Sequence, residues 1–162
     1  MAVALISPQS AAWFPCAALV CGLSVVAQLV DAQDLRLVDA AESQNGEAVA
    51  SLLAAGTNPN VPHADGATAL HWAAHWNDEA MATRLLEAGA DVNVANELGI
   101  TPLALAALNA SAPLGQALLE AGANPNAARP SGETVLMTAA RTGSADLVQA
   151  LLKAGAEIEP AS

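Results

Sequence analysis

The sequence contains few aromatic residues and no tyrosine. Its 162 residues include one phenylalanine and three tryptophans, whereas 54% of the residues are hydrophobic, many of them alanine. Aromatic side chains usually contribute much of the area that a core buries. Their scarcity argues against a core of bulky side chains and favours helices with small side chains that pack closely.

Basic residues are also scarce. The sequence has five lysines and arginines against 16 acidic residues, and its net charge is −11. Nucleic-acid binding needs basic side chains that displace counterions from phosphates, so the sequence predicts no nucleic-acid partner. The acidic residues are scattered rather than clustered. We therefore interpret the charge as favouring solubility, with a basic partner as the alternative.

The two cysteines, Cys16 and Cys21, both lie near the start of the sequence. The rest of the chain therefore needs no disulfide and would tolerate an oxidising compartment. Residues 16–27 form an apolar run of the length found in signal peptides, and Val30-Asp31-Ala32 is typical of a cleavage site. These features predict a signal peptide over residues 1–32.

One feature of a signal peptide is missing, because no lysine or arginine precedes Arg36. Two alternatives therefore stay open: an uncleaved membrane anchor over residues 11–30, and a disordered leader. Cleavage would leave Gln33 as the first residue, which is where the regular part of the sequence begins.

From Asp34 onward the sequence repeats with a period of 33 residues. The positions that keep this step are Gly56, Gly89, Gly122 and Gly155, the leucine pairs that begin at Leu52, Leu85, Leu118 and Leu151, and the alanine pairs that begin at Ala40, Ala73, Ala106 and Ala139. A fixed period of this length indicates an array of stacked units. We divide residues 33–162 into units at about 34–63, 64–96, 97–129 and 130–162.

Each unit reads as two helices followed by a loop. In the second unit, Thr68 is a good N-cap for a first helix, and Asp78 can cap a second helix over residues 79–88. Gly89 stands where a left-handed residue ends a helix, and the polar residues 90–99 predict a turn-rich loop. Such a unit cannot bury its apolar face alone, so neighbouring units must stack.

Two segments of this unit resemble the ankyrin repeat. They are Thr-Ala-Leu-His-Trp-Ala-Ala at 68–74 and Leu-Leu-Glu-Ala-Gly-Ala-Asp-Val-Asn at 85–93, and Thr101-Pro102-Leu103 begins a second close match. The resemblance covers about residues 34–159. It implies an all-α fold, an ankyrin-repeat solenoid of about four stacked helix-turn-helix units joined by long loops, but it leaves the partner open.

The two terminal units differ from the pattern. The first unit has Leu35-Arg36-Leu37-Val38 in place of the usual motif. Its charged residues predict an N-terminal capping repeat whose outer face is hydrophilic and exposed to solvent. In the fourth unit we expect five apolar residues to lack a covering neighbour. These are Leu147, Val148, Leu151, Leu152 and Ile158. The fourth unit then either ends the stack with an exposed apolar face or docks on something else, or the chain is a truncated form of a longer array.

The resemblance implies a binding surface on the loop tips and the inner helices, and a protein partner whose identity the sequence does not give. The partner-binding candidates at these positions are Asp65, His75, Trp76, Leu98, Ile100, Leu108, Asn109, Arg141 and Thr142. Leu98, Ile100 and Leu108 predict an apolar centre for this surface, with Trp76 beside it.

Several of these residues have a structural alternative. Trp76 stands where the other units have polar residues, so it is either a binding anchor or packs against the first helix of the third unit. Leu98 and Ile100 either bind a partner or pack between neighbouring loops. Trp72 belongs to a variable position and is either a core or a surface residue.

The sequence predicts no metal site, cofactor or catalytic activity. His71 and His75 are four residues apart, but zinc needs three or four ligands, and the resemblance implies that His71 stabilises a loop. Asp78-Glu79 lies at a helix N-terminus, where the helix dipole explains it. We find no phosphate-binding glycine loop and no nucleophile elbow.

The sequence therefore predicts an exported protein-binding scaffold, periplasmic or secreted, with membrane anchoring through residues 11–30 as the alternative location. An alanine-rich repeat domain behind an export signal resembles bacterial envelope proteins. The alternative function is that of a truncated N-terminal part of a longer ankyrin array with a mainly structural role.

Overall fold

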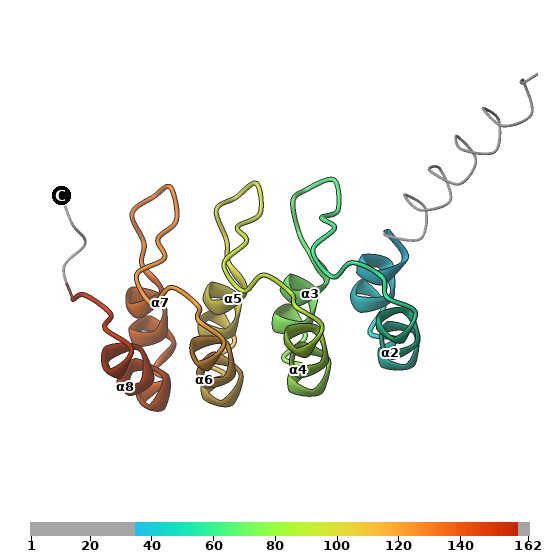
Figure 1. Ribbon diagram of the computed structural model, residues 1–162. Coiled ribbons are helices and arrows are strands. Elements are labelled where there is room, and N and C mark those ends of the chain that lie inside the picture. Colours follow the sequence, from blue (N-terminus) through green and yellow to red (C-terminus); the bar gives the residue numbers. More distant parts are fainter. Residues whose placement is uncertain (1–34, 159–162) are drawn as a thin grey trace, which may run out of the picture. The chain divides into compact units, whose positions relative to one another are not determined.

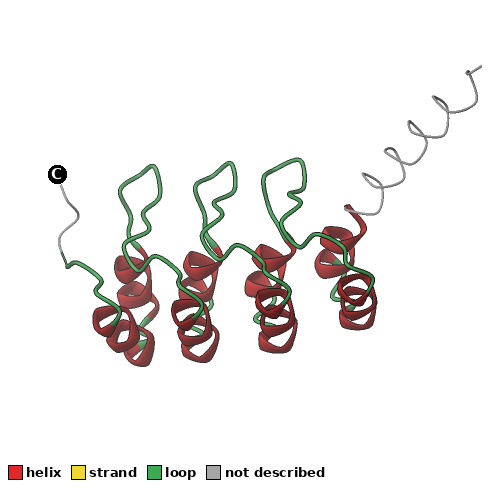
Figure 2. Ribbon diagram, viewed as in Figure 1, coloured by secondary structure: helices red, strands yellow, loops and turns green. Residues whose placement is uncertain are grey.

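The computed structural model describes residues 35–158, which fold into helix pairs stacked in a row (Figure 1 and Figure 2). Residues 35–42 are helical and precede the labelled helices. The labelled helices are α2 (Gly46–Ala54), α3 (Ala69–His75), α4 (Glu79–Glu87), α5 (Pro102–Leu108), α6 (Ala112–Glu120), α7 (Val135–Thr142) and α8 (Ala145–Lys153). The predicted all-α class and the stack of helix pairs are confirmed.

The helices begin at the capping residues that the sequence indicates. The carboxylate of Asp78 accepts a hydrogen bond from the backbone N–H of Met81 at 2.9 Å, at the start of α4. Thr101 accepts from the N–H of Ala104 at 3.3 Å, and Pro102 occupies the first position of α5. Each cap pairs an amide that has no partner within the helix.

The outer helices end at left-handed glycines. Gly89 follows α4 with φ of 85°, and its N–H donates to the carbonyl of Leu86 at 3.0 Å. The next amide, that of Ala90, returns to the carbonyl of Leu85 at 2.9 Å. This conformation is open to glycine without a Cβ clash, which explains why a glycine recurs there.

The helices form two layers. The inner helices α3, α5 and α7 contact one another in order along the row, and the outer helices α2, α4, α6 and α8 do the same. Leu70 and Leu85 are fully buried between the layers, and so is the alanine pair Ala73-Ala74. Because alanine adds so little width, the helices of adjacent units come close, and the seam between units supplies the core.

Gly115 shows how closely two outer helices approach. It lies within α6, and a Cβ at this position would overlap the side chain of Leu147 in α8. Glycine is a poor helix former, by about 1 kcal/mol relative to alanine. The packing of Leu147 against the bare backbone therefore explains this residue better than helix propensity does.

Asparagine side chains connect the loops of successive units. The side chain of Asn60 donates to the carbonyl of Gly89 at 3.0 Å and accepts from the N–H of Asp91 at 2.6 Å. The same pair of bonds recurs for Asn93 with Gly122 and Asn124, and for Asn126 with Gly155 and Glu157. Each asparagine thus pairs a carbonyl that the end of an outer helix leaves free.

One expectation for the fourth unit is wrong in part. Leu147 and Leu151 are completely buried, because they face α6 and α7 rather than away from the stack. Val148 is half-buried, whereas Leu152 and Ile158 are exposed, with Ile158 at 77%. Met137 on α7 is exposed as well. The proposal of a longer array stays a prediction.

The predictions for residues 1–32 lie outside the described residues. They concern the signal peptide, its cleavage before Gln33 and the alternative anchor over residues 11–30. Of the helices within residues 35–158, none has the length and apolar character that a membrane span requires.

Candidate protein-binding surface

Three loops between units form short hairpins beside α3, α5 and α7 (Figure 1). We name them the first hairpin (63–67), the second hairpin (96–100) and the third hairpin (129–133). Each closes with a bond from its first backbone N–H to its last carbonyl, at 2.7, 3.0 and 3.0 Å in that order. We call these hairpins together with α3, α5 and α7 the hairpin face.

The second hairpin is held by a buried histidine of the preceding unit. The Nδ1 atom of His71 accepts from the backbone N–H of Thr68 at 3.1 Å, so the proton lies on Nε2. Nε2 lies 3.0 Å from the carbonyl oxygen of Ile100 and donates to it. Burial lowers the pKa of His71 below its ordinary value of 6.5, against the raising effect of the bond to Ile100. The neutral ring thus links α3 to the next unit, as the resemblance implied.

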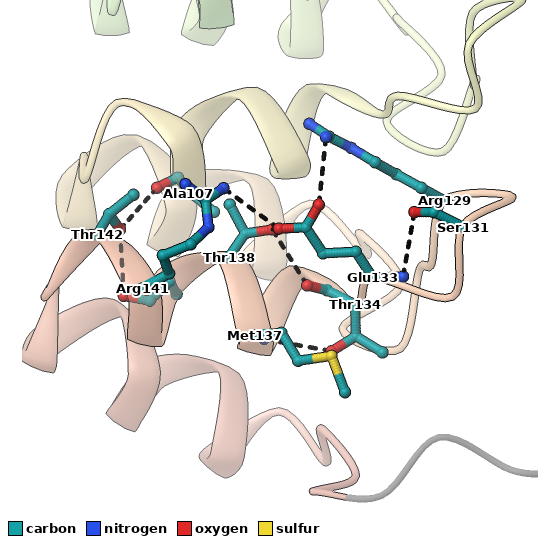
Figure 3. A network of polar contacts seen from close by, with 10 residues as sticks. Ala107, Arg129, Ser131, Glu133, Thr134, Met137, Thr138, Arg141 and Thr142 are labelled. Carbon is teal, nitrogen blue, oxygen red and sulfur yellow. Dashed lines mark hydrogen bonds and ion pairs between the residues drawn. The ribbon is translucent and has the colours of Figure 1, made fainter.

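The third hairpin is held by a charged network between its own residues and α7 (Figure 3). The carboxylate of Glu133 accepts from Arg129 at 3.3 Å, from Arg141 at 3.2 Å and from the hydroxyl of Thr138 at 3.2 Å. The bond from Arg141, followed by that from Thr138, lowers the pKa of Glu133. The predicted site residue Arg141 is therefore engaged with Glu133.

Three predicted site residues serve the stack as well. The indole N–H of Trp76 donates to the carbonyl of Glu42 at 3.1 Å. One unit later, Asn109 donates to the carbonyls of Ala74 and His75, each at 2.9 Å. Thr142 in turn donates to the carbonyl of Ala107 at 3.0 Å. This position thus pairs a carbonyl at the end of the preceding inner helix, and the indole of Trp76 bonds to the first unit.

An open pocket of about 220 Å³ lies between the first hairpin, the second hairpin and the inner helices of units two and three. It is lined by Asp65, Ala67, His71, Trp72, His75, Asn96 and Leu105. The structure thus brings together the predicted residues Asp65 and His75 at one site. The sequence missed the contributions of Trp72, Asn96 and Leu105, because only the stacking of two units places them around one hollow.

The aromatic wall of this pocket is built from α3. The ring of His75 meets that of Trp72 edge-on at 5.7 Å and that of Trp76 at 4.7 Å. Trp72 is half-buried, and its Nε1 is buried with no acceptor among the residues that the structure describes. An unpaired buried N–H costs about 1–3 kcal/mol. Within residues 35–158, this indole N–H thus adds no hydrogen bond to the stability of the fold.

The apolar residues of the hairpin face differ in exposure. Leu98, near the tip of the second hairpin, is 70% exposed, and Trp76 is 43% exposed. Ile100 and Leu108 are half-buried, and Ile100 packs against the core while its carbonyl pairs with His71. The exposed large apolar side chains of the hairpin face are therefore Leu98, Trp76 and, on α7, Met137.

The two histidines of α3 do not form a metal site with their neighbours. Both ring nitrogens of His71 are engaged in hydrogen bonds. Within residues 35–158, no group of three or more histidine, cysteine or acidic side chains has the arrangement of a metal site.

A second concavity, of about 540 Å³, lies on the outer helices α6 and α8. Its lining is a mixture of polar and apolar residues, and the polar ones include Gln116, Glu120, Asp146 and Lys153. Three alanines, Ala112, Ala150 and Ala154, are also among its lining residues. It contains no predicted site residue.

The comparisons with known proteins agree with this architecture. A family model described as Ankyrin repeats (3 copies) matches residues 17–96, 37–129 and 84–161. A search of the curated proteins found no match. Domains of this kind generally bind other proteins and are typically non-catalytic. With helix pairs, hairpins and family match in agreement, the chain belongs to the ankyrin repeat family.

Proposed function

We propose that this ankyrin domain captures one protein partner on the hairpin face of its second and third units. The observation that carries the proposal is Leu98, an apolar side chain 70% exposed near the tip of the second hairpin. Nothing in the fold requires a leucine there, since the equivalent residues of the first and third hairpins are Asp65 and Ser131. Burying a leucine side chain in an interface contributes about 1.5–3 kcal/mol.

The surroundings of Leu98 support the same face. The backbone N–H of Glu97 donates to the carbonyl of Asp65 at 3.0 Å, so the second hairpin lies against the first. The aromatic pocket opens beside these two hairpins. An apolar centre beside a pocket, with polar and charged residues around it, fits the general anatomy of a protein interface. Asn109 and Thr142 contribute area rather than hydrogen bonds to this face, because their donors are already engaged within the fold. Arg141 is exposed and has further N–H groups besides the one that donates to Glu133.

The test is crosslinking and capture in the native compartment, with Leu98→Ser compared with the unaltered chain. We expect the yield of the captured protein to fall about tenfold or more, because the apolar anchor is lost. Leu152→Ser is the matched control, since Leu152 is also exposed but belongs to the outer helix α8. Equal capture by the Leu98→Ser variant contradicts the proposed face.

We propose further that the domain acts outside the cytoplasm. The support is in the sequence: the apolar run over residues 16–27 precedes the repeats, and both cysteines lie before Gln33. N-terminal sequencing of the protein recovered from its native compartment tests this proposal. A chain that begins at Gln33 in the exported fraction supports it, and an intact N-terminus in the cytoplasmic fraction contradicts it.

A further inference from the structure

We propose that the pocket of Asp65, Trp72 and His75 receives an arginine side chain of the protein partner. The inference rests on the proposed function, because it names the chemistry of the contact beside Leu98. It concerns one pocket, and its argument uses the size, the charge and the aromatic wall of that pocket.

The size fits one side chain. The pocket has a volume of about 220 Å³. A water molecule has a share of about 30 Å³ in the liquid, so the pocket has room for about seven waters. Sites for drug-sized ligands start at about 300 Å³. The pocket is therefore suited to a single long side chain that enters from a partner's surface.

The charge fits a cation. Asp65 is the one carboxylate among the lining residues, and the lining contains no lysine or arginine. One oxygen of Asp65 accepts from the N–H of Ala67 at 3.0 Å, and the other makes no hydrogen bond with the described residues. Glu97, in the adjacent hairpin, is exposed and adds a second negative charge near the pocket.

The aromatic wall distinguishes arginine from lysine. Trp72 and His75 meet edge-on at 5.7 Å, which fixes the two rings at nearly a right angle, 89°. A guanidinium is planar, is weakly hydrated, stacks on aromatic faces and pairs with a carboxylate through several N–H groups. A lysine ammonium carries the same charge but has no planar group that could stack on an aromatic ring. The combination of Asp65 with these rings thus favours arginine.

The experiment titrates the full chain with N-acetyl-arginine methylamide and follows the indole N–H signal of Trp72 by NMR, assigned with Trp72→Leu. We expect a saturable shift with a millimolar dissociation constant. The matched citrulline compound has the same shape without the charge, and we expect it to bind at least tenfold more weakly. The lysine compound should bind several-fold more weakly. Equal binding of arginine and citrulline, or of arginine and lysine, overturns the assignment.

Two variants test the residues. Asp65→Asn keeps the oxygen that accepts from Ala67, so the hairpin should fold as before while arginine binding weakens at least fivefold. Asp146→Asn removes a carboxylate from the groove on α6 and α8 and should leave the binding unchanged. Unchanged binding by Asp65→Asn, or an equal loss with Asp146→Asn, contradicts the proposal.

The two proposals fail in different ways. Loss of capture with Leu98→Ser, combined with no saturable arginine binding, keeps the hairpin face and overturns the arginine pocket. Arginine binding with capture that Leu98→Ser leaves unchanged overturns the face proposed for the partner. Loss of capture with both Leu98→Ser and Asp65→Asn supports both.

Discussion

The second and third hairpins have the same length and the same closing hydrogen bond, but different side chains hold them. The second is held by His71, a buried and neutral residue of the preceding unit, which donates to the carbonyl of Ile100. The third is held by the charges around Glu133, which come from the hairpin itself and from α7. One arrangement ties a hairpin to the preceding inner helix, α3, and the other ties a hairpin to the inner helix that follows it, α7. The difference teaches that a repeated backbone shape does not imply a repeated interaction.

The cause of the difference is one residue. Ala104 stands in the third unit where the second has His71, so the third hairpin has no equivalent of the bond from His71 to Ile100. The carbonyl of Ile100 accepts from both Asn96 and His71, whereas in the described residues the carbonyl of Glu133 accepts only from Arg129. The network around Glu133 takes the place of the missing histidine.

The largest predicted effect is that of His71→Ala. The substitution leaves the buried amide of Thr68 and the carbonyl of Ile100 without this partner and opens a cavity. We expect the free energy of unfolding to fall by about 2–4 kcal/mol. Urea denaturation measures it. His75→Ala, one turn later and exposed, is the control and should cost much less; a loss below about 0.5 kcal/mol for His71→Ala would refute the comparison.

Acidification should weaken the two hairpins in separate pH ranges. The pKa of His71 is lowered in the folded state, so below about pH 6.5 the unfolded chain binds the proton first and stability falls. The pKa of Glu133 is also lowered, but from 4.5, so its contribution is lost only as the pH falls below that value. Urea midpoints from pH 8 to pH 4 test this. In His71→Ala the decline between pH 6.5 and pH 5 should become shallower, and an unchanged decline contradicts the account.

Transfer of the histidine to the third unit should sharpen the comparison. In Ala104→His, we expect the new ring to donate to the carbonyl of Glu133 and to accept from the amide of Thr101, as His71 does one unit earlier. The expected gain is about 1 kcal/mol at pH 8, because burial of the polar ring offsets part of the two added hydrogen bonds. Urea denaturation measures the gain, which should diminish at pH 5. A loss of stability at pH 8 would show that the third hairpin has no room for this link.

The smallest effect is predicted for Glu133→Gln. Its carboxylate is partly exposed, and ion pairs near the surface contribute little and are screened by salt. We expect a small decrease of the melting temperature at low salt. The decrease should largely disappear in 1 M NaCl, where the Debye length is about 3 Å and the ion pairs are screened. The effect of His71→Ala should persist in the same salt. A salt-independent decrease as large as that of His71→Ala would contradict this ranking.

The sequence predicted the stack because its signals are local and periodic. Thr101, Asp78 and Gly89 act within one helix turn, so their roles follow from the order of residues alone. The role of His71 followed from the resemblance. The 33-residue step also showed that neighbouring units use the same seam.

The rest depends on contacts that break the period. No other unit has the same set of charged residues at the positions of Arg129, Glu133 and Arg141, so the repeat pattern does not predict their network. The polar residues at the position of Trp76 suggested an exposed anchor, but they share with it a bond to the preceding helix end. The burial of Leu147 and Leu151 depended on which side of α8 faces the stack. The aromatic pocket could not be predicted, because its lining residues come from two units and meet only when these units stack.

The account depends most on the hairpin face as the place where the partner binds. A photoreactive residue at position 98 tests it directly, with the same residue at position 152 on the outer helix as the comparison, followed by irradiation in the native compartment. The account predicts one protein adduct from position 98 and none from position 152. An adduct from position 152 alone, or equal adducts from both, would contradict it.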